Sequence, residues 1–174
     1  ENNTESEKYL DKINCIKYSK SVEEWLDLNL NDRFDFIMLF DVIEHLREPF
    51  KVLERLLKNH CTHKGVIIVT APYINTFSKF VLNRIWFQYK VEHLFYFSKK
   101  SITYIEKQLK CDRLLFRAHS KILTVEYLLN IGTSFGPKKF IKFIKLVRRF
   151  IPKKTYQKNI KLPLGEMLWI IKNK

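Results

Sequence analysis

The sequence predicts an α/β fold that is organised around a mostly parallel β-sheet, and three observations support this. An unbroken apolar run covers Phe36–Phe40, an amphipathic helical pattern begins at Pro49, and a second apolar run covers Val66–Val69. Strands that are apolar at every position are typical of parallel sheets, because crossover helices cover both of their faces. We therefore expect a strand, a polar loop, a helix and a second strand between residues 34 and 72.

Polar and aromatic side chains follow each of these two strands. Asp41, Glu44 and His45 come after the first strand, and Pro72 and Tyr73 come at the end of the second. In open α/β sheets the ligand binds outside the carboxyl ends of the strands. This edge is therefore the predicted functional site.

The N-terminal elements are predicted from periodicity and helix caps. We expect a helix over Thr4–Lys12 and a strand over Ile13–Tyr18. Ser21 and Glu24 fit a capping box that begins a short helix. Pro49 suits the first turn of the next helix, where its missing N–H costs nothing. The side chains of that helix that should face the sheet are Phe50, Leu53, Leu56 and Leu57.

After Tyr73, residues 75–97 form an aromatic segment that we expect to lie over the strand edge as a helical lid, and we call it the lid segment. Ser98 suits the cap of a helix over Lys99–Leu109, and a loop is predicted over Gly132–Gly136. A bulge or tight bend is expected at Gly165. Further predicted elements are a strand over Leu114–Ala118, a weak helix over Thr124–Asn130 and a last strand over Leu162–Ile171.

The chain is strongly basic, with 32 Lys and Arg against 18 Asp and Glu and a formal net charge of +14. Such a charge indicates an anionic partner or, alternatively, a solvated basic surface. Residues 137–152 include a predicted basic amphipathic helix, FIKFIKLVRRFI, which Pro152 ends. A helix of this kind either lies on an anionic membrane surface, binds a partner, or packs as an ordinary surface helix.

Composition indicates a folded cytoplasmic protein. Hydrophobic residues make up 46% of the 174 residues, which is too many for a disordered chain. The polar, acidic start is unlike a secretory signal, and no stretch approaches the ~20 apolar residues that span a bilayer. The cysteines, Cys15, Cys61 and Cys111, are odd in number and lack CxxC spacing. We expect them to be reduced thiols and expect no thiolate metal cluster.

Three segments together resemble one enzyme class. FDFIMLFDVIEHLREPFKVLERLLKNHCTHKGVIIVTAP at residues 34–72 and VEHLFYFS at residues 91–98 are similar to the D-V-[IL]-E-H-[IL] and E-H-L-x-Y-F-S motifs of a group of class I S-adenosylmethionine-dependent methyltransferases. LPLGEMLWIIKNK at residues 162–174 resembles the last strand of that group. The resemblance implies a single domain over residues 1–174 with a Rossmann-like, mostly parallel sheet whose last strand is antiparallel.

The chain departs from this class in its glycines. The class begins with a strand and a glycine-rich loop that wraps the methionine part of the cofactor. This chain has four glycines, the first at Gly65, and none forms such a loop. The resemblance therefore implies an N-terminally incomplete domain, in which the first strand and loop precede residue 1. The alternative is a chain that cannot hold the cofactor unaided.

The cofactor implied by the resemblance is S-adenosyl-L-methionine (SAM). Glu1 matches the acidic residue that binds the ribose hydroxyls, and Ser21, followed by Val22, stands where the class often has Asp near the adenine. Phe40 and Asp41, at the end of the central strand, complete the implied cofactor-binding set.

Methyl transfer from a sulfonium needs the protein mainly to position the acceptor and, where required, to remove its proton. His93 is the first candidate base, because His titrates near neutral pH and because sugar C-methyltransferases of this group use the pair that matches Glu92-His93. Glu44, His45 and Glu92 are further candidate bases. The alternative for His93 is a buried residue with a structural hydrogen bond.

The expected acceptor is a small molecule: a sugar, a lipid-linked compound or another metabolite. Their positions at the strand end and in the lid segment suggest Tyr73, Trp86 and Tyr96 as acceptor contacts. Tyr at a strand end is as often core, and the alternative for the aromatic stripe that includes Trp86 is also plain core. His60 and His63, at the far end of the helix that begins near Pro49, are predicted surface residues.

Two alternatives come from other classes. Asp41, Glu44 and His45 with His93 resemble the E-x-x-E-H and distal His that hold Mg²⁺ in plant-type small-RNA 2′-O-methyltransferases. With the +14 charge, this suggests an RNA methyltransferase, although no recognised RNA-binding module is present and nucleic acid is not the expected partner. Otherwise Glu44 and His45 only cap the next helix. The second alternative is a non-catalytic methyltransferase-like binding unit.

Overall fold

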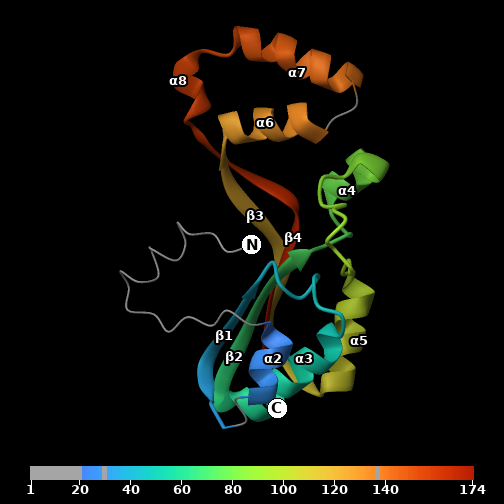
Figure 1. Cartoon of the computed structure of the whole chain (residues 1–174), viewed down its shortest axis with the longest axis vertical. Coiled ribbons are helices and arrows are strands. Elements are labelled where there is room, and N and C mark those ends of the chain that lie inside the picture. Colours follow the sequence, from blue (N-terminus) through green and yellow to red (C-terminus); the bar gives the residue numbers. More distant parts are fainter. Residues whose placement is uncertain (1–20, 29–30, 136–137) are drawn as a thin grey trace.

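The computed structural model describes residues 21–28, 31–135 and 138–174. Glu1, the predicted helix over residues 4–12 and the predicted strand over residues 13–18 lie outside these ranges. Four strands form one sheet in the order β1-β2-β4-β3 (Figure 1). The strands are β1 (Phe34–Phe40), β2 (Cys61–Pro72), β3 (Cys111–Thr124) and β4 (Asn159–Asn173).

The strand directions confirm the predicted α/β sheet. β1 and β2 are parallel, and β4 is antiparallel to both of its neighbours, β2 and β3. β3 therefore runs in the same direction as β1 and β2, and the last strand in sequence is the antiparallel one. This is the direction pattern that the resemblance implied.

Helices cover one face of the sheet. α2 (Val22–Leu28), α3 (Pro49–Arg55) and α5 (Lys99–Leu109) all contribute side chains to one hydrophobic core. The paired strand residues Leu39, Val69 and Trp169 lie at the centre of that core. The predicted inward side chains of α3 and the turn after it are confirmed, with Leu53, Leu56 and Leu57 buried and Phe50 packed against them.

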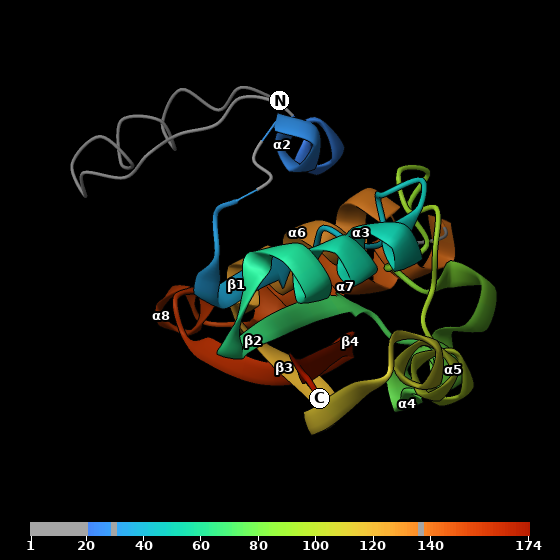
Figure 2. The ribbon, with the colours of Figure 1, turned by 90° about the horizontal axis from the view of Figure 1, so that it is seen from below.

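The opposite face of β1 is bare within the described ranges. Phe36, Met38 and Phe40 alternate with the core residues and are 66%, 57% and 54% exposed. Successive side chains of a strand point to opposite faces, so these three share one face. Figure 2 shows β1 at the edge of the sheet, with α3 beside it on the covered side.

Two helices begin as the sequence predicts. The Ser21 amide donates to Glu24 Oε2 at 3.0 Å, and the Glu24 amide donates to Ser21 Oγ at 3.2 Å. At α5, Ser98 and Ser101 form the same reciprocal pattern. Each cap satisfies amide groups that the first helical turn leaves without partners.

The prediction for His60 is wrong. α3 continues into a π-helical turn, Leu56–His60, that leads directly into β2. His60 is fully buried there, with Nδ1 2.9 Å from the Asp32 carbonyl and its ring 5.0 Å from the Trp25 ring. The wider π turn places this residue under Trp25 instead of in solvent. His63, by contrast, is exposed as expected.

The lid segment is helical only at its start. α4 (Phe77–Leu82) begins at the Thr76 cap, and a short 3₁₀ turn (Asn83–Ile85) follows it. Beyond that turn the chain is irregular up to α5. Trp86 is buried against β4, whereas Phe77 and Phe80 of α4 are 78% and 82% exposed. The helical lid is therefore shorter than the sequence pattern suggested.

β3 and β4 are longer than predicted and continue as a two-stranded ribbon beyond the sheet (Figure 1). At its end lie α6 (Val125–Phe135), α7 (Lys138–Phe150) and α8 (Lys153–Tyr156), which we call the helical hairpin. The predicted loop over residues 132–136 is wrong up to Phe135, because α6 continues that far against α7. In the described residues, no helix is long and apolar enough to cross a membrane.

Gly165 fixes the approach of the lid segment to β4. Its φ is +85°, and a Cβ there would lie 2.5 Å from Cζ2 of Trp86. We expect Gly165→Ala to lower the free energy of unfolding by about 2–3 kcal/mol, through backbone strain and displacement of the indole. Urea unfolding measures this, with the exposed Lys161→Ala on the same strand as control. An unchanged midpoint would show that this close approach is not needed.

Candidate functional site

The site begins at the turn that follows β1. Asp41 has a positive φ of 53°, and its amide donates to the Thr70 carbonyl at 3.1 Å. Ile43 is then fully buried in the core, and the His45 amide closes the turn on the Val42 carbonyl at 3.0 Å. Because Ile43 anchors this turn, the Glu44 side chain is carried inward and is only 1% exposed.

A loop from the lid segment docks on this turn. The amides of Leu94 and Phe95 both donate to the Glu44 carbonyl, at 2.8 and 3.2 Å. His45 Nδ1 donates to the Glu92 carbonyl at 2.9 Å. These contacts join two segments far apart in the sequence and place His93 directly beside Glu44 and His45.

Glu44, His45 and His93 form the resulting cluster. One nitrogen or oxygen atom from each lies within 4.8 Å of the others, and the two imidazole rings are 4.8 Å apart at 77°. Glu44 and His93 are buried, while His45 is exposed. Within the described residues, Glu44 Oε2 and His93 Nδ1 have no hydrogen-bond partner. Buried polar atoms without partners are costly, and they mark places that a ligand or ion can complete.

Burial controls the protonation of this cluster. Desolvation raises the pKa of Glu44 from 4.5 to about 7, with Asp41 and Glu166 adding to the effect and a backbone hydrogen bond and His45 opposing it. Desolvation also lowers the pKa of His93, with help from the nearby Lys90 and His45 charges. Near neutral pH the imidazole is therefore uncharged, and Glu44 exchanges its proton readily.

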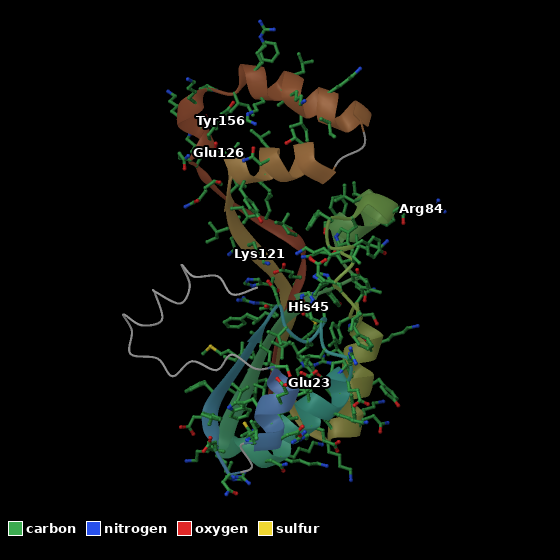
Figure 3. All side chains as sticks on the ribbon, in the orientation of Figure 1. Glu23, His45, Arg84, Lys121, Glu126 and Tyr156 are labelled. Carbon is green, nitrogen blue, oxygen red and sulfur yellow. The ribbon has the colours of Figure 1, made fainter. Side chains whose placement is uncertain are left out.

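An ionic network that the sequence analysis missed, with the buried Glu166 at its centre, lies beside the cluster. Lys121 Nζ on β3 is 3.0 Å from Asp41 Oδ2 and 2.5 Å from Glu166 Oε1. Gln88 Nε2 donates to the same Glu166 oxygen at 2.8 Å. Burial lowers the pKa of Lys121, but the hydrogen bonds to Glu166 and Asp41 outweigh it and raise the pKa. Lys121 therefore stays cationic. Figure 3 shows Lys121 and His45 in the middle of the molecule, below the helical hairpin.

Two hollows adjoin the cluster. The first, which we call the α2 hollow, has a volume of about 740 Å³ and is lined by residues of α2 and of the turn after β1. The second, the lid hollow, has a volume of about 820 Å³ and lies between the lid segment, the ribbon and α6. His45 lines the first and Glu92 lines the second, and these two residues are hydrogen-bonded to each other, whereas Glu44 and His93 line neither hollow.

Some of the predicted cofactor-binding residues lie together. Ser21, Val22 and Asp41 line the α2 hollow together. Phe40 lies at the end of β1 on the bare face of the sheet, outside the lining of this hollow. Glu1 lies outside the described residues.

The predicted acceptor residues separate. Trp86 lines the lid hollow, and Tyr96 packs beside it, with its ring centroid 6.2 Å from Trp86 and 6.0 Å from His93. Tyr73 is a core residue, edge-on to Phe116, and burial raises the pKa of its hydroxyl. Tyr73 lines neither hollow, and its position agrees with the core alternative for a Tyr at a strand end.

The group of possible metal ligands in the structure is smaller than the one that the sequence suggested. Asp41 does not belong to the cluster, because its carboxylate is held by Lys121 and accepts from Thr70 Oγ1 at 3.2 Å. Glu44, His45 and His93 remain as a group that could hold a divalent ion. The hydrogen bond from His45 Nδ1 to Glu92 leaves Nε2 as the free acceptor, as in many metal-binding histidines.

The fold is that of class I SAM-dependent methyltransferases. A SAM-dependent methyltransferase from Archaeoglobus fulgidus aligns over 90% of this chain and 66% of its own, with a TM-score of 0.53 and 13% identity. A SAM-dependent methyltransferase from Thermotoga maritima aligns over 86% of this chain and 60% of its own, at a TM-score of 0.47 and 12% identity. At such identity the first likeness establishes the fold alone, and the chain spans less than two thirds of the length of either structure.

No protein-family model matches the sequence, and no curated protein matches it significantly. Any activity of this chain therefore depends on the side chains of its own site.

Glu44 gives a direct test of the electrostatics. A carboxyl whose pKa is about 7 when folded and 4.5 when unfolded binds a proton more tightly in the folded state. Its contribution to stability is therefore largest below pH 4.5 and is lost as the pH rises to 7, by on the order of 3 kcal/mol. Glu44→Gln should flatten the stability curve in this window. Urea unfolding from pH 4.5 to 7.5 measures it, with the exposed Glu48→Gln as control. Parallel curves for wild type and Glu44→Gln would contradict the assigned burial.

Proposed function

We propose that this protein transfers a methyl group from SAM to a small-molecule acceptor, with His93 as the general base. The observation that carries the proposal is the convergence of Glu44, His45 and His93 at the carboxyl edge of the sheet, where His45 lines the α2 hollow and Glu92, the residue before His93, lines the lid hollow. In open α/β sheets this edge is where ligands bind. The methyltransferase fold supplies the reaction class.

The α2 hollow fits the adenosine part of SAM in size and lining. Ligand sites commonly occupy about 300–1,000 Å³ and combine apolar walls with a few polar groups. Here Val22, Val42 and Leu46 supply apolar surface, and Ser21 and Asp41 supply oxygen atoms. When bound, SAM supplies a methyl group on a sulfonium, whose thioether leaves readily.

The cradle for the methionine part of SAM is not found among the described residues. The apolar side chains on the bare face of β1 offer a surface for further structure at this sheet edge. We include in the proposal that residues N-terminal to this chain add the first strand, the glycine-rich loop and the helices of that face. The free edge of β1 would then be paired, as sheet edges normally are.

His93 suits proton removal by its position and its charge state. Its lowered pKa keeps the imidazole neutral at pH 7, and its free Nδ1 can accept a proton from an acceptor hydroxyl or amine. Glu44, beside it, stabilises the imidazolium that forms. The Glu92 carboxylate is exposed and lies 3.9 Å from the Lys90 ammonium. The group that Glu92 contributes to the site is therefore its backbone carbonyl, which accepts the hydrogen bond from His45.

The lid hollow suits an acceptor with an apolar part and at least one polar group. Trp86, Phe87 and Tyr127 provide aromatic walls. Lys121 and Glu166 provide a fixed cation and carboxylate at one end. Such a lining favours a metabolite, a sugar derivative or a lipid-linked molecule.

Binding of S-adenosylhomocysteine tests the cofactor assignment. We expect calorimetry to show binding by a form extended at the N-terminus and weaker or no binding by residues 1–174 alone. Failure of the extended form to bind would overturn the enzymatic proposal and leave a non-catalytic binding unit.

Substitution of His93 tests the base. In the form that binds the cofactor, His93→Ala should lower kcat by about 10²–10⁴-fold while S-adenosylhomocysteine binding is kept. The exposed His63→Ala is the matched control. Turnover of His93→Ala equal to that of the control would remove His93 from this role.

A metal-assisted variant of the same reaction is the second candidate, and the unpartnered Glu44 and His93 atoms favour it. Two imidazoles and one carboxylate suit Mn²⁺, Fe²⁺ or Zn²⁺ better than Mg²⁺. Calorimetry with Mn²⁺ should show one site in wild type and none in Glu44→Gln. Absence of Mn²⁺ binding, with activity unaffected by EDTA, would exclude this variant.

A further inference from the structure

The positive charge of the chain is concentrated in the helical hairpin and the ribbon strand that follows it. Between Tyr127 and Gly165 there are ten Lys and Arg and no Asp or Glu. The whole chain has a formal charge of +14, so ten of these charges belong to this segment and the remainder of the chain is close to balanced. The charge is therefore a local feature of one end of the molecule, and it is not a general property of the surface.

α7 carries two parallel stripes on its solvent side. Phe143, Leu146 and Phe150 are 59%, 57% and 76% exposed, at the spacing that places residues on one helix face. Each follows a basic residue directly in sequence, and these basic residues form a second stripe at the same spacing. The basic stripe consists of Lys142, Lys145 and Arg149, all exposed.

The bare apolar stripe is separate from the side that holds the hairpin together. α7 packs against α6, and its buried residue Ile144 lies on a different face from Phe143, Leu146 and Phe150. α8 is tied to α7 by the Tyr156 hydroxyl, which donates to the Arg148 carbonyl at 2.9 Å, while the Arg148 guanidinium lies over the Tyr156 ring. The exposed stripe is thus not required for the packing of the hairpin itself.

We propose that the helical hairpin docks on an anionic lipid bilayer through this face of α7. An interfacial helix buries large apolar side chains at the headgroup level and places Lys and Arg beside acidic headgroups. The stripe of Phe143, Leu146 and Phe150 provides the first group, and the adjoining basic stripe provides the second. A segment without acidic residues is complementary to an acidic surface along its whole length. Nucleic acid would require the cations but leave three large apolar side chains in water.

The position of the hairpin links this membrane contact to the lid hollow. Figure 1 places α6, α7 and α8 at one end of the long axis, away from α2 and α3. Tyr127 of α6 and Leu123 of β3 line the lid hollow, so this hollow reaches from Glu92, the residue before His93, to the base of the hairpin. Docking would hold the lid hollow near the bilayer, which favours an acceptor anchored in lipid. This last step rests on the proposed function, whereas the membrane contact does not.

Cosedimentation with vesicles tests the membrane contact without any methyl transfer. At 0.1 M salt, we expect residues 1–174 to bind vesicles of phosphatidylcholine with 30% phosphatidylglycerol with about 100-fold higher affinity than vesicles of pure phosphatidylcholine. Lys142→Gln/Lys145→Gln/Arg149→Gln should weaken this binding by roughly 100-fold, and Phe143→Ser/Leu146→Ser/Phe150→Ser by at least about 10-fold. Circular dichroism should show both variants folded, because all six side chains are exposed.

Two matched controls remove the same kinds of side chain elsewhere. Lys99→Gln/Lys100→Gln/Lys107→Gln on α5 removes three exposed cations, and Phe36→Ser/Met38→Ser removes bare apolar side chains of β1. Both should bind vesicles within about threefold of wild type, since separated charges are screened at this salt.

Four outcomes would overturn the proposal. The first is equal binding to neutral and acidic vesicles, and the second is a loss of binding in either control variant as great as in the α7 variants. The third is tighter binding to single-stranded RNA than to vesicles. The fourth is a wild-type dimer that the Phe143→Ser/Leu146→Ser/Phe150→Ser variant converts to a monomer. The last would identify the stripe as a self-association surface. If vesicles bind as expected but the N-terminally extended form does not bind S-adenosylhomocysteine, the membrane contact stands and the methyltransferase proposal fails.

Discussion

The candidate site depends on one contact, the docking of the loop around Leu94 on the turn that follows β1. The Glu44 carbonyl accepts from two amides of that loop, and His45 donates to the Glu92 carbonyl. These bonds satisfy backbone groups of two irregular segments that would otherwise be buried without partners. They also close the site over Glu44, so the geometry and the electrostatics have the same origin. The raised pKa of Glu44 and the lowered pKa of His93 both follow from the loss of water at this contact.

The sheet holds the candidate site, and the helical hairpin holds the proposed membrane-binding face. The covered face of the sheet holds the core, and β3, β4 and the turn after β1 bring Lys121, Glu166 and Asp41 together at one edge. The bare face of β1 and the bare stripe of α7 differ in the side chains that lie beside them. The first is an apolar row on an edge strand, which suits further protein structure, whereas the second lies beside a row of cations, which suits an acidic surface.

The sequence predicted what local patterns determine. The central strands follow from unbroken apolar runs, and α2 and α5 follow from Ser21 and Ser98 as caps. The strand-end position of Glu44 and the motif around His93 were enough to select the residues that the structure brings together. In each case the signal is contained within a few adjacent residues.

The rest depended on contacts between distant segments. The burial of His60 requires Trp25 of another helix, and the engagement of Asp41 requires Lys121 of β3, so neither was visible locally. Glu166 gave a signal in the sequence, because it is a carboxylate inside the otherwise apolar strand predicted over Leu162–Ile171. Lys121 gave none. The continuation of α6 to Phe135 overrides the glycine within it, since tertiary packing on α7 outweighs a propensity cost of about 1 kcal/mol.

The most direct test of the shared cleft is an NMR titration of the imidazole nitrogens, with His93 assigned by its loss in His93→Gln. If Glu44 and His93 lie together as described, the His93 nitrogens will titrate below the ordinary histidine range. They will also show a second inflection near pH 7 that disappears in Glu44→Gln. A His93 that titrates like an exposed histidine, with a curve that Glu44→Gln leaves unchanged, would contradict the account.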